Sequence, residues 1–150
     1  MPQSLSLVIV HVVFSTKDRA PCLGPTIRPE LYAYLAEVSR NSGCDCYRIG
    51  GMSDHVHLAA RLSRTLTIAG LVQELKTSSS SWLKTKTPAL ASFAWQRGYG
   101  SFSVAPRDLD SVVAYIDNQE EHHRTRTFQE EYRMFLTRYG IDFDERYVWD

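Results

Sequence analysis

The sequence lacks three features that would assign it to a well-defined class of protein. It has no apolar run of the ~20 residues that a membrane-spanning helix requires, and the apolar start from Leu5 to Phe14 is interrupted by His11. Its three cysteines form an odd set, in which Cys44 and Cys46 lie too close together for an ordinary disulfide. A G-x-x-x-x-G-K-[ST] phosphate-binding loop is also absent. We therefore expect a cytoplasmic protein without a membrane-spanning segment, structural disulfides or a nucleotide cofactor.

A chain of 150 residues is long enough for one globular domain with its own core and too short for two domains of ordinary size. No internal repeat or linker-like segment divides it. The hydrophobic fraction of 43% and the charged fraction of 23% are ordinary for folded proteins, so neither a disordered chain nor a coiled coil is indicated. We expect residues 1–150 to form a single domain.

The formal net charge is zero, which by itself argues weakly against a nucleic-acid partner. The distribution of charge is uneven, however, because residues 75–107 contain five basic side chains and no acidic one. Aromatic residues are interleaved with them: Trp82, Phe93, Trp95, Tyr99 and Phe102. Such a mixture suits phosphate contact with base stacking, and solvated charges around core aromatics are the alternative. Lys76 and Arg97 are candidate DNA contacts, with an ordinary surface lysine as the alternative for Lys76.

Hydrophobic patterns predict the order strand, helix, strand, strand, helix, strand, helix. The predicted elements are a central strand at 4–16, a helix at 29–41, strands at 44–50 and 55–62, a helix from 68 to about 82, a strand at 99–104 and a third helix that starts near Pro106. A short helix and an aromatic tail are expected within 127–150. This order predicts an α+β fold, a ferredoxin-like antiparallel sheet with helices on one face plus an added C-terminal helix.

The strongest local signal is the motif Asp54-His55-Val56-His57 in the strand predicted at 55–62. Successive side chains of a strand point to opposite faces, so His55 and His57 point the same way and can share one metal ion. Two half-exposed histidines without a metal are the alternative. Asp54 can orient one imidazole by a hydrogen bond or can simply cap the turn.

Tyr115 and Gln119 lie four positions apart on the third predicted helix and therefore share one face of it. That face flanks the apolar stripe of the helix, so packing against the sheet would hold a phenol and an amide at the edge of the core, facing a cleft. A boundary tyrosine and a surface glutamine are the alternative.

Two competing assignments remain open from the residues alone. His122 lies on nearly the same flank as Gln119, so His55, His57 and His122 form a rival metal site. Tyr99 stands between two glycines, which permit close approach of a ligand to the backbone, and it is a second candidate nucleophile.

Three ordered segments carry a family resemblance: GGMSDHVHLAARL, FAWQRGYGSFSV and VVAYIDNQEEHHR. Together they resemble the insertion-sequence-200-like transposases, single-tyrosine members of the HUH endonuclease superfamily, whose name stands for histidine, hydrophobic residue, histidine. The similarity runs over essentially the whole chain. It implies that His55 and His57 are metal ligands, that Tyr115 is the nucleophile and that Gln119 is the helix-borne metal ligand.

The resemblance also implies an activity and its partners. The family cuts and rejoins single-stranded DNA at the ends of small mobile elements, typically at hairpins, through a phosphotyrosine intermediate. The implied cofactor is Mg or Mn, although imidazole ligands also suit Zn, Ni and Fe. The implied assembly is a homodimer in which the tyrosine helix of one subunit completes the histidine site of the other.

Three other functions remain as alternatives at this point. One is a domesticated relative that acts on repeated extragenic palindromes. Another is a non-catalytic module that binds single-stranded nucleic acid by basic and aromatic residues alone. The third is a metal-dependent hydrolase of a small substrate that uses the rival site with His122.

Overall fold

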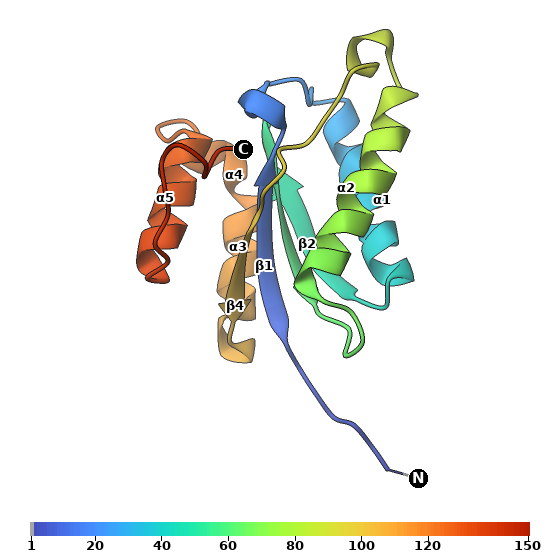
Figure 1. Ribbon diagram of the computed structural model, residues 1–150, viewed down its shortest axis with the longest axis vertical. Helices are drawn as coiled ribbons and strands as arrows, with labels where there is room; N and C mark the ends of the chain where they lie inside the picture. Colours follow the sequence, from blue (N-terminus) through green and yellow to red (C-terminus); the bar gives the residue numbers. More distant parts are fainter. Residues whose placement is uncertain (1) are drawn as a thin grey trace.

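The structure, a computed structural model, describes residues 2–150 and contains a four-stranded antiparallel sheet in the order β2-β3-β1-β4 (Figure 1). The strands are β1 Ile9–Ser15, β2 Asp45–Gly51, β3 His55–Arg61 and β4 Gly100–Val104. In β1, Val13 pairs with His57 of β3 on one side and with Gly100 of β4 on the other. Every residue of this central strand is buried, which explains why its sequence is almost continuously apolar.

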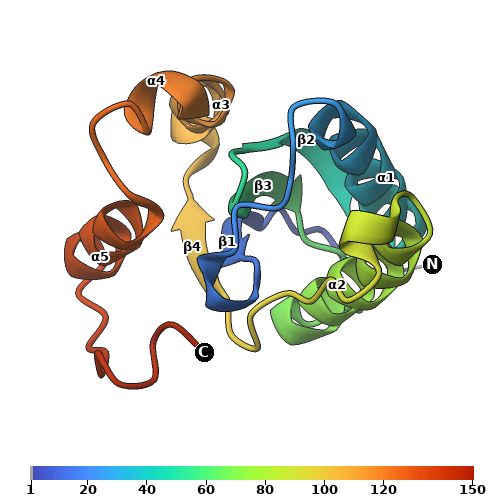
Figure 2. The ribbon, with the colours of Figure 1, turned by 90° about the horizontal axis from the view of Figure 1, so that it is seen from above.

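Two long helices, α1 Ile27–Asn41 and α2 Ile68–Lys84, cover one face of the sheet (Figure 2). Alternate residues of β1 and β3 form the core beneath them: Val10, Val12, Phe14, Val56, Leu58 and Ala60. The serine run at residues 78–81 is helical, and α2 continues to Lys84, two residues beyond the predicted end. Ser79 is buried in it and donates its hydroxyl to the carbonyl oxygen of Leu75 at 2.6 Å, so this hydroxyl is paired.

Three shorter helices, α3 Leu109–Asp117, α4 Gln119–His122 and α5 Phe128–Arg138, lie on the opposite face of the sheet (Figure 2). A second apolar cluster joins α5 to β1 and β4: Val13, Phe102, Phe128, Tyr132, Phe135 and Leu136. The predicted α+β fold with a ferredoxin-like antiparallel sheet is therefore confirmed. The two crossover helices share one face as predicted, and the added C-terminal helices cover the other.

The third predicted helix is divided in the structure, because Asn118 separates α3 from α4 with φ −99° and ψ 25°. Its side-chain amide donates to the carbonyl oxygen of Ala114 at 3.0 Å. Asparagine competes in this way with the helical hydrogen-bond pattern, and the chain turns at that residue. Gln119 thus begins a short helix of its own rather than continuing the helix that carries Tyr115.

Gly50 of β2 allows α3 to approach the sheet closely. A Cβ atom at this position would lie 2.7 Å from the carbonyl oxygen of Ile116, which is too close for any larger residue without movement. Gly50 also pairs with His57 across the β2–β3 ladder. The close approach therefore places the C-terminal end of α3 beside the histidine pair.

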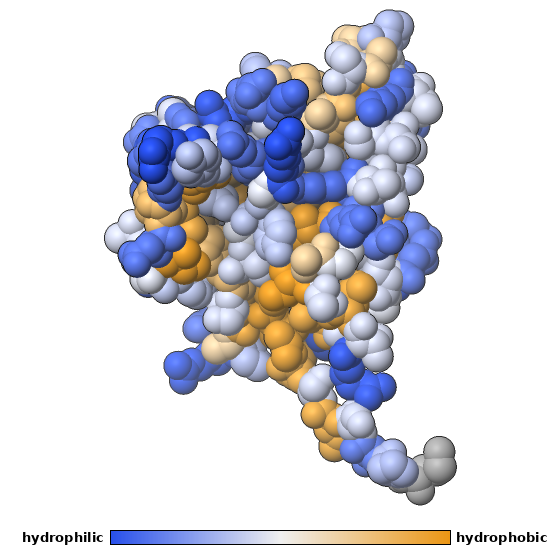
Figure 3. All heavy atoms as spheres, in the orientation of Figure 1, coloured by the Kyte–Doolittle hydropathy of each residue, from blue (hydrophilic) through white to orange (hydrophobic). Residues whose placement is uncertain are grey.

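The first described residues, 2–8, extend away from the sheet without regular structure, so β1 begins later than the predicted strand (Figure 1). Apolar side chains are exposed in this arm (Figure 3), and Leu5 is 86% exposed. Within residues 2–150, no helix combines the length and the apolar character needed to cross a membrane.

Candidate active site

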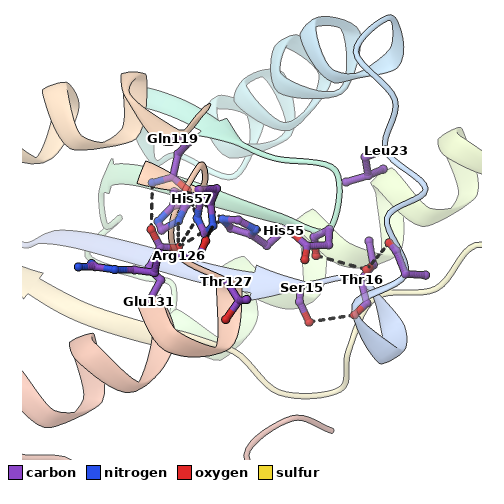
Figure 4. A network of polar contacts seen from close by, with 12 residues as sticks. Ser15, Thr16, Leu23, His55, His57, Gln119, Arg126, Thr127 and Glu131 are labelled. Carbon is purple, nitrogen blue, oxygen red and sulfur yellow. Dashed lines mark hydrogen bonds and ion pairs between the residues drawn. The ribbon is translucent and has the colours of Figure 1, made fainter. Parts of the chain in front are cut away.

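The site is built on β3, from which His55 and His57 project toward the α3–α5 side of the sheet (Figure 4). Both side chains are fully buried, and their ring centroids are 5.1 Å apart. Val56 and Leu58 point to the opposite face and join the core under α1 and α2. The alternation of the strand therefore brings two imidazoles together at one buried place.

Each imidazole of the pair has its Nδ1 atom occupied by a neighbour. His55 Nδ1 donates to Asp54 Oδ1 at 2.7 Å, so Asp54 orients an imidazole. His57 Nδ1 shares a hydrogen bond of 2.8 Å with Nε2 of His11 from β1. Such partners fix the orientation of metal-binding histidines. Both Nε2 atoms consequently point inward, toward the residues of α4 and α5.

Gln119 and Tyr115 reach this place from α4 and α3 of the same chain. The Gln119 amide oxygen lies 2.9 Å from His55 Nε2, and its amide nitrogen donates to Glu131 Oε2 at 3.1 Å. Tyr115 is half-buried, and its hydroxyl donates to the same oxygen of Glu131. The break at Asn118 does not separate the two side chains, because both meet at one carboxylate.

Glu131 of α5 was missed in the sequence and lies at the centre of the cluster (Figure 4). It is completely buried, and its Oε1 accepts from His57 Nε2 at 2.9 Å and lies 3.3 Å from His55 Nε2. A signal for it was available, because Phe128, Tyr132 and Phe135 form the apolar stripe of α5 and Glu131 falls within that stripe. An acidic residue on an apolar helix face is rarely buried without a partner.

The histidine that joins the pair is His123 rather than His122. Its Nε2 lies 3.1 Å from Gln119 Oε1 and 3.2 Å from Glu131 Oε1. The ring of His122 instead stacks on that of Tyr115, with centroids 4.3 Å apart and an angle of 24°. The rival metal site that includes His122 is therefore not assembled in the structure.

The electrostatics of the cluster set the protonation of each group. Burial lowers the pKa of His57, and burial next to His57 lowers the pKa of His11 to about 3. Burial also acts to lower the pKa of His55, but hydrogen bonds to the carboxylates of Asp54 and Glu131 outweigh it and raise that pKa to about 9. The neutral His57 and the protonated His55 thus face the same carboxylate.

Opposite effects act on the two acids. Burial by itself would raise the pKa of Glu131, but the imidazoles around it hold this pKa far below the ordinary range. Burial and the negative charge of Glu131 raise the pKa of Tyr115. In the absence of a metal, the cluster therefore contains an ionised carboxylate that holds a protonated phenol.

The two candidate DNA contacts occupy different environments. Lys76 donates from Nζ to the carbonyl oxygens of Gln96 at 2.7 Å and Gly98 at 2.6 Å, so its charge holds the loop before β4. Arg97 in that loop is exposed. Tyr99, the second candidate nucleophile, lies beside Lys76, with Nζ 6.0 Å from the centroid of its ring.

The chemistry of the donors fits a divalent cation. Ligand atoms of His55, His57 and Glu131 lie within 4.8 Å of one another, and all three side chains are buried. Gln119 adds an amide oxygen at the same place. Two imidazole nitrogens with carboxylate and amide oxygens form a set that suits Mn and, through its oxygens, Mg. The arrangement can therefore hold a metal ion next to a phenol.

Comparisons with solved structures show that the fold is shared with transposases. The structure of a "putative transposase" from Deinococcus radiodurans R1 aligns with a TM-score of 0.62 and 22% identity, covering 79% of this chain and 98% of that one. A REP-associated tyrosine transposase bound to a REP hairpin aligns with a TM-score of 0.59 and 16% identity, covering 82% of this chain and 74% of that one. No curated protein matches the chain.

The family model described as "Transposase IS200 like" matches residues 4–119, from the arm before β1 to the first residue of α4. This span includes His55, His57, Tyr115 and Gln119 and ends before α5. Because the match extends over well more than half of the sequence, the chain belongs to the IS200-like transposase family.

Proposed function

We propose that this chain is a DNA transposase that cuts and rejoins single-stranded DNA through a covalent phosphotyrosine at Tyr115. The observation that carries the proposal is the convergence of five side chains from four elements at one buried place: Tyr115, His55, His57, Gln119 and Glu131. A nucleophile and a set of metal donors thus lie within reach of a single phosphate group. Family membership supports the same conclusion.

In the proposed enzyme, His55, His57 and Gln119 hold a divalent cation, Mg or Mn. A bound cation of this kind polarises phosphate oxygens and lowers the demand on a phenol, whose ordinary pKa is about 10. The chain itself orients the ligands, because Asp54 and His11 fix the two imidazoles through their Nδ1 atoms. The buried position of the pair excludes water from the side of the sheet.

The proposed reaction exchanges one phosphodiester for another. The Tyr115 oxygen forms a bond to phosphorus and loses its proton, while the bond from phosphorus to the 3′ oxygen breaks and that oxygen leaves as a hydroxyl. Rejoining is the reverse step with a second 3′ hydroxyl. Because a phosphodiester is kept throughout, the proposed reaction needs no nucleotide cofactor.

A cleft of about 370 Å³ between α3 and α5 leads to Tyr115. Phe135 and Tyr139 line it with aromatic rings, and Arg138 adds a positive charge. Aromatic rings and a guanidinium are suited to a nucleotide, because bases stack on the former and phosphates pair with the latter. We propose that the cleaved strand enters here, with Arg97 as a further DNA contact outside the cleft.

Hairpin ends are the proposed substrate. A REP-associated tyrosine transposase of the same fold is bound to a REP hairpin, which makes a hairpin with single-stranded flanks the first oligonucleotide to test. Whether the element is mobile or the chain is a domesticated relative depends on the surrounding genome. A single transposase domain, a homodimer and a cytoplasmic location also stay predictions.

The test is formation of a covalent protein–DNA adduct on hairpin oligonucleotides with Mg or Mn, detected by denaturing gel electrophoresis. The proposal expects an adduct that disappears on addition of chelator and in the Tyr115→Phe variant. Tyr99→Phe is the matched control, and it should keep the adduct. DNA binding without any adduct, insensitive to chelator, would instead identify a non-catalytic binding module.

A further inference from the structure

The helix α5 begins at a well-defined residue and presents one face to the site. Thr127 and Glu130 form a reciprocal capping box, which satisfies the first backbone N–H groups and fixes where the helix starts. Phe128 and Phe135 anchor the apolar face against His55 and Phe102, with centroid distances of 4.7 and 5.2 Å. These contacts hold the helix in one rotation about its axis. Glu131 consequently points at the histidine pair.

A carboxylate at this position is not needed for packing. Its neighbours on the same face of α5 are aromatic or aliphatic, and burial of an acid is strongly unfavourable unless partners surround it. A well-packed apolar residue in place of a buried ionic group is often neutral or stabilising. The presence of Glu131 on this face is therefore better explained by what it contacts than by stability.

The two oxygens of Glu131 have different partners. Oε1 faces the imidazole nitrogens, at 2.9 Å from His57 Nε2 and 3.3 Å from His55 Nε2. Oε2 accepts from the Tyr115 hydroxyl and from the Gln119 amide nitrogen. Oε1 thus lies among the metal donors, and Oε2 contacts the nucleophile.

Glu131 also lies outside the residues that define the family match, which ends at Gln119. The helix that carries it is joined to the matched region by residues 120–127, and His123 in this connection is itself part of the cluster. The site therefore extends beyond the four residues that the family resemblance implies.

We infer that Glu131 is an additional active-site residue, which contributes Oε1 to the metal-ligand set and uses Oε2 to position the Tyr115 hydroxyl beside the metal. This inference rests on the proposed function. It makes α5 a third part of the active site, together with β3 and the α3–α4 segment. A single carboxylate then fixes the distance between the cation and the attacking oxygen.

The experiment uses two substitutions of Glu131 in the full chain. Glu131→Gln removes the charge with little change of shape, whereas Glu131→Asp keeps the charge and shortens the side chain by one methylene, so it cannot contact both sets of partners. Mn²⁺ affinity is measured without DNA, by electron paramagnetic resonance of the free ion. Adduct formation is measured in a single turnover at saturating hairpin DNA and Mn²⁺.

We expect Glu131→Gln to weaken Mn²⁺ binding by about 10- to 100-fold, as for other groups that support a metal site. Glu131→Asp should retain more of the affinity but should slow adduct formation at saturating Mn²⁺, because the phenol is no longer held. The dissociation constant for the hairpin should change little in either variant. Glu121→Gln is the matched control, since it removes a carboxylate from α4 that is 71% exposed, and it should behave as wild type.

Circular dichroism of each variant establishes that the fold is kept. The inference is wrong if both folded variants bind Mn²⁺ and form adducts as wild type does. If Glu131→Gln does not fold, Glu131→Asp with unchanged Mn²⁺ affinity and unchanged adduct rate overturns it equally. Absence of any adduct with the wild-type protein would instead contradict the proposed function, while the Mn²⁺ measurement would still report on Glu131.

Discussion

The amide oxygen of Gln119 lies 2.9 Å from Nε2 of His55 in the same chain, although 64 positions separate the two residues. Tyr115 reaches the same cluster through Glu131. One chain therefore brings together the predicted nucleophile and the three predicted metal ligands, without a second copy. The family resemblance implies the other arrangement, in which the tyrosine helix of one subunit serves the histidines of its partner. The two arrangements make opposite predictions for mixtures of inactive variants.

We predict that each chain uses its own tyrosine. Tyr115→Phe and His57→Ala should each be inactive, and a mixture of the two, unfolded and refolded together so that any subunits exchange, should stay inactive. With shared sites, a mixed dimer would contain one intact pair of histidines facing one intact tyrosine. Adduct formation by the mixture, measured on a denaturing gel, would therefore show that the site is completed between subunits.

A second prediction concerns His11 of β1, whose Nε2 lies 2.8 Å from His57 Nδ1. In the structure, His57 Nε2 donates to Glu131. For Nε2 to bind a metal ion, the ring proton must lie on Nδ1, where Nε2 of His11 can accept it. His11→Phe should lower Mn²⁺ affinity by about 10-fold or more, measured by titration calorimetry. His122→Ala is the control, because His122 stacks on Tyr115 and does not contact the pair. Equal Mn²⁺ affinity in the His11 variant and wild type would show that His57 needs no such partner.

The histidine pair and the residues at 115 and 119 could be found in the sequence because both depend on local periodicity. A strand of period two places His55 and His57 together, and a helical spacing of four places Tyr115 and Gln119 on one side. The break at Asn118 was not visible in that spacing, because an asparagine inside a helical pattern does not by itself end a helix. The side chains converge nevertheless.

Glu131, His123 and His11 could not be found in the same way. Each reaches the site only through the tertiary arrangement of α5, the loop before it and β1, and no local pattern specifies which elements become neighbours. The available hints were polar residues in apolar surroundings, an acid on the apolar face of α5 and a histidine in a buried strand. Such residues are rarely buried without partners, so they can be listed as candidates from a sequence but not assigned to one another.

The third prediction separates the two candidate DNA contacts. Lys76→Met keeps the aliphatic stem but removes the donor to the carbonyl oxygens of Gln96 and Gly98. It should lower the free energy of unfolding by about 1–3 kcal/mol, as expected when partly buried polar groups lose their partner. Arg97→Ala should leave stability unchanged but weaken DNA binding and reduce its salt dependence by about one phosphate contact. Urea unfolding and binding at several salt concentrations measure these effects.

The opposite results would contradict the roles assigned to Lys76 and Arg97. A stable Lys76→Met variant with weakened DNA binding would identify Lys76 as a phosphate contact, as the sequence first indicated. An Arg97→Ala variant with the DNA affinity and salt dependence of wild type would remove Arg97 from the interface.

The fourth prediction is a stability maximum near pH 6.5 for the metal-free protein. In the unfolded chain His11 binds a proton below pH 6.5, but burial beside His57 keeps it neutral in the folded state down to about pH 3. The unfolded state then binds more protons, so the free energy of unfolding falls as the pH drops below 6.5. The slope from His11 alone is about 1.4 kcal/mol per pH unit. The pKa of His57 is also lowered by burial, so His57 makes the free energy of unfolding fall more steeply below pH 6.5.

Above pH 6.5 the free energy of unfolding changes with pH in the opposite direction, because of His55. Its carboxylate partners Asp54 and Glu131 keep this histidine protonated up to about pH 9 in the folded state. The unfolded chain loses that proton near pH 6.5, so the folded state binds more protons and the free energy of unfolding falls as the pH rises from 6.5 to 9. Urea unfolding in EDTA across pH 4.5–9 measures the free energy of unfolding on both sides of pH 6.5. His11→Gln should weaken the dependence of the free energy of unfolding on pH only below pH 6.5. Asp54→Asn should weaken it only above pH 6.5. A curve that rises steadily with pH would contradict the protonated state assigned to His55.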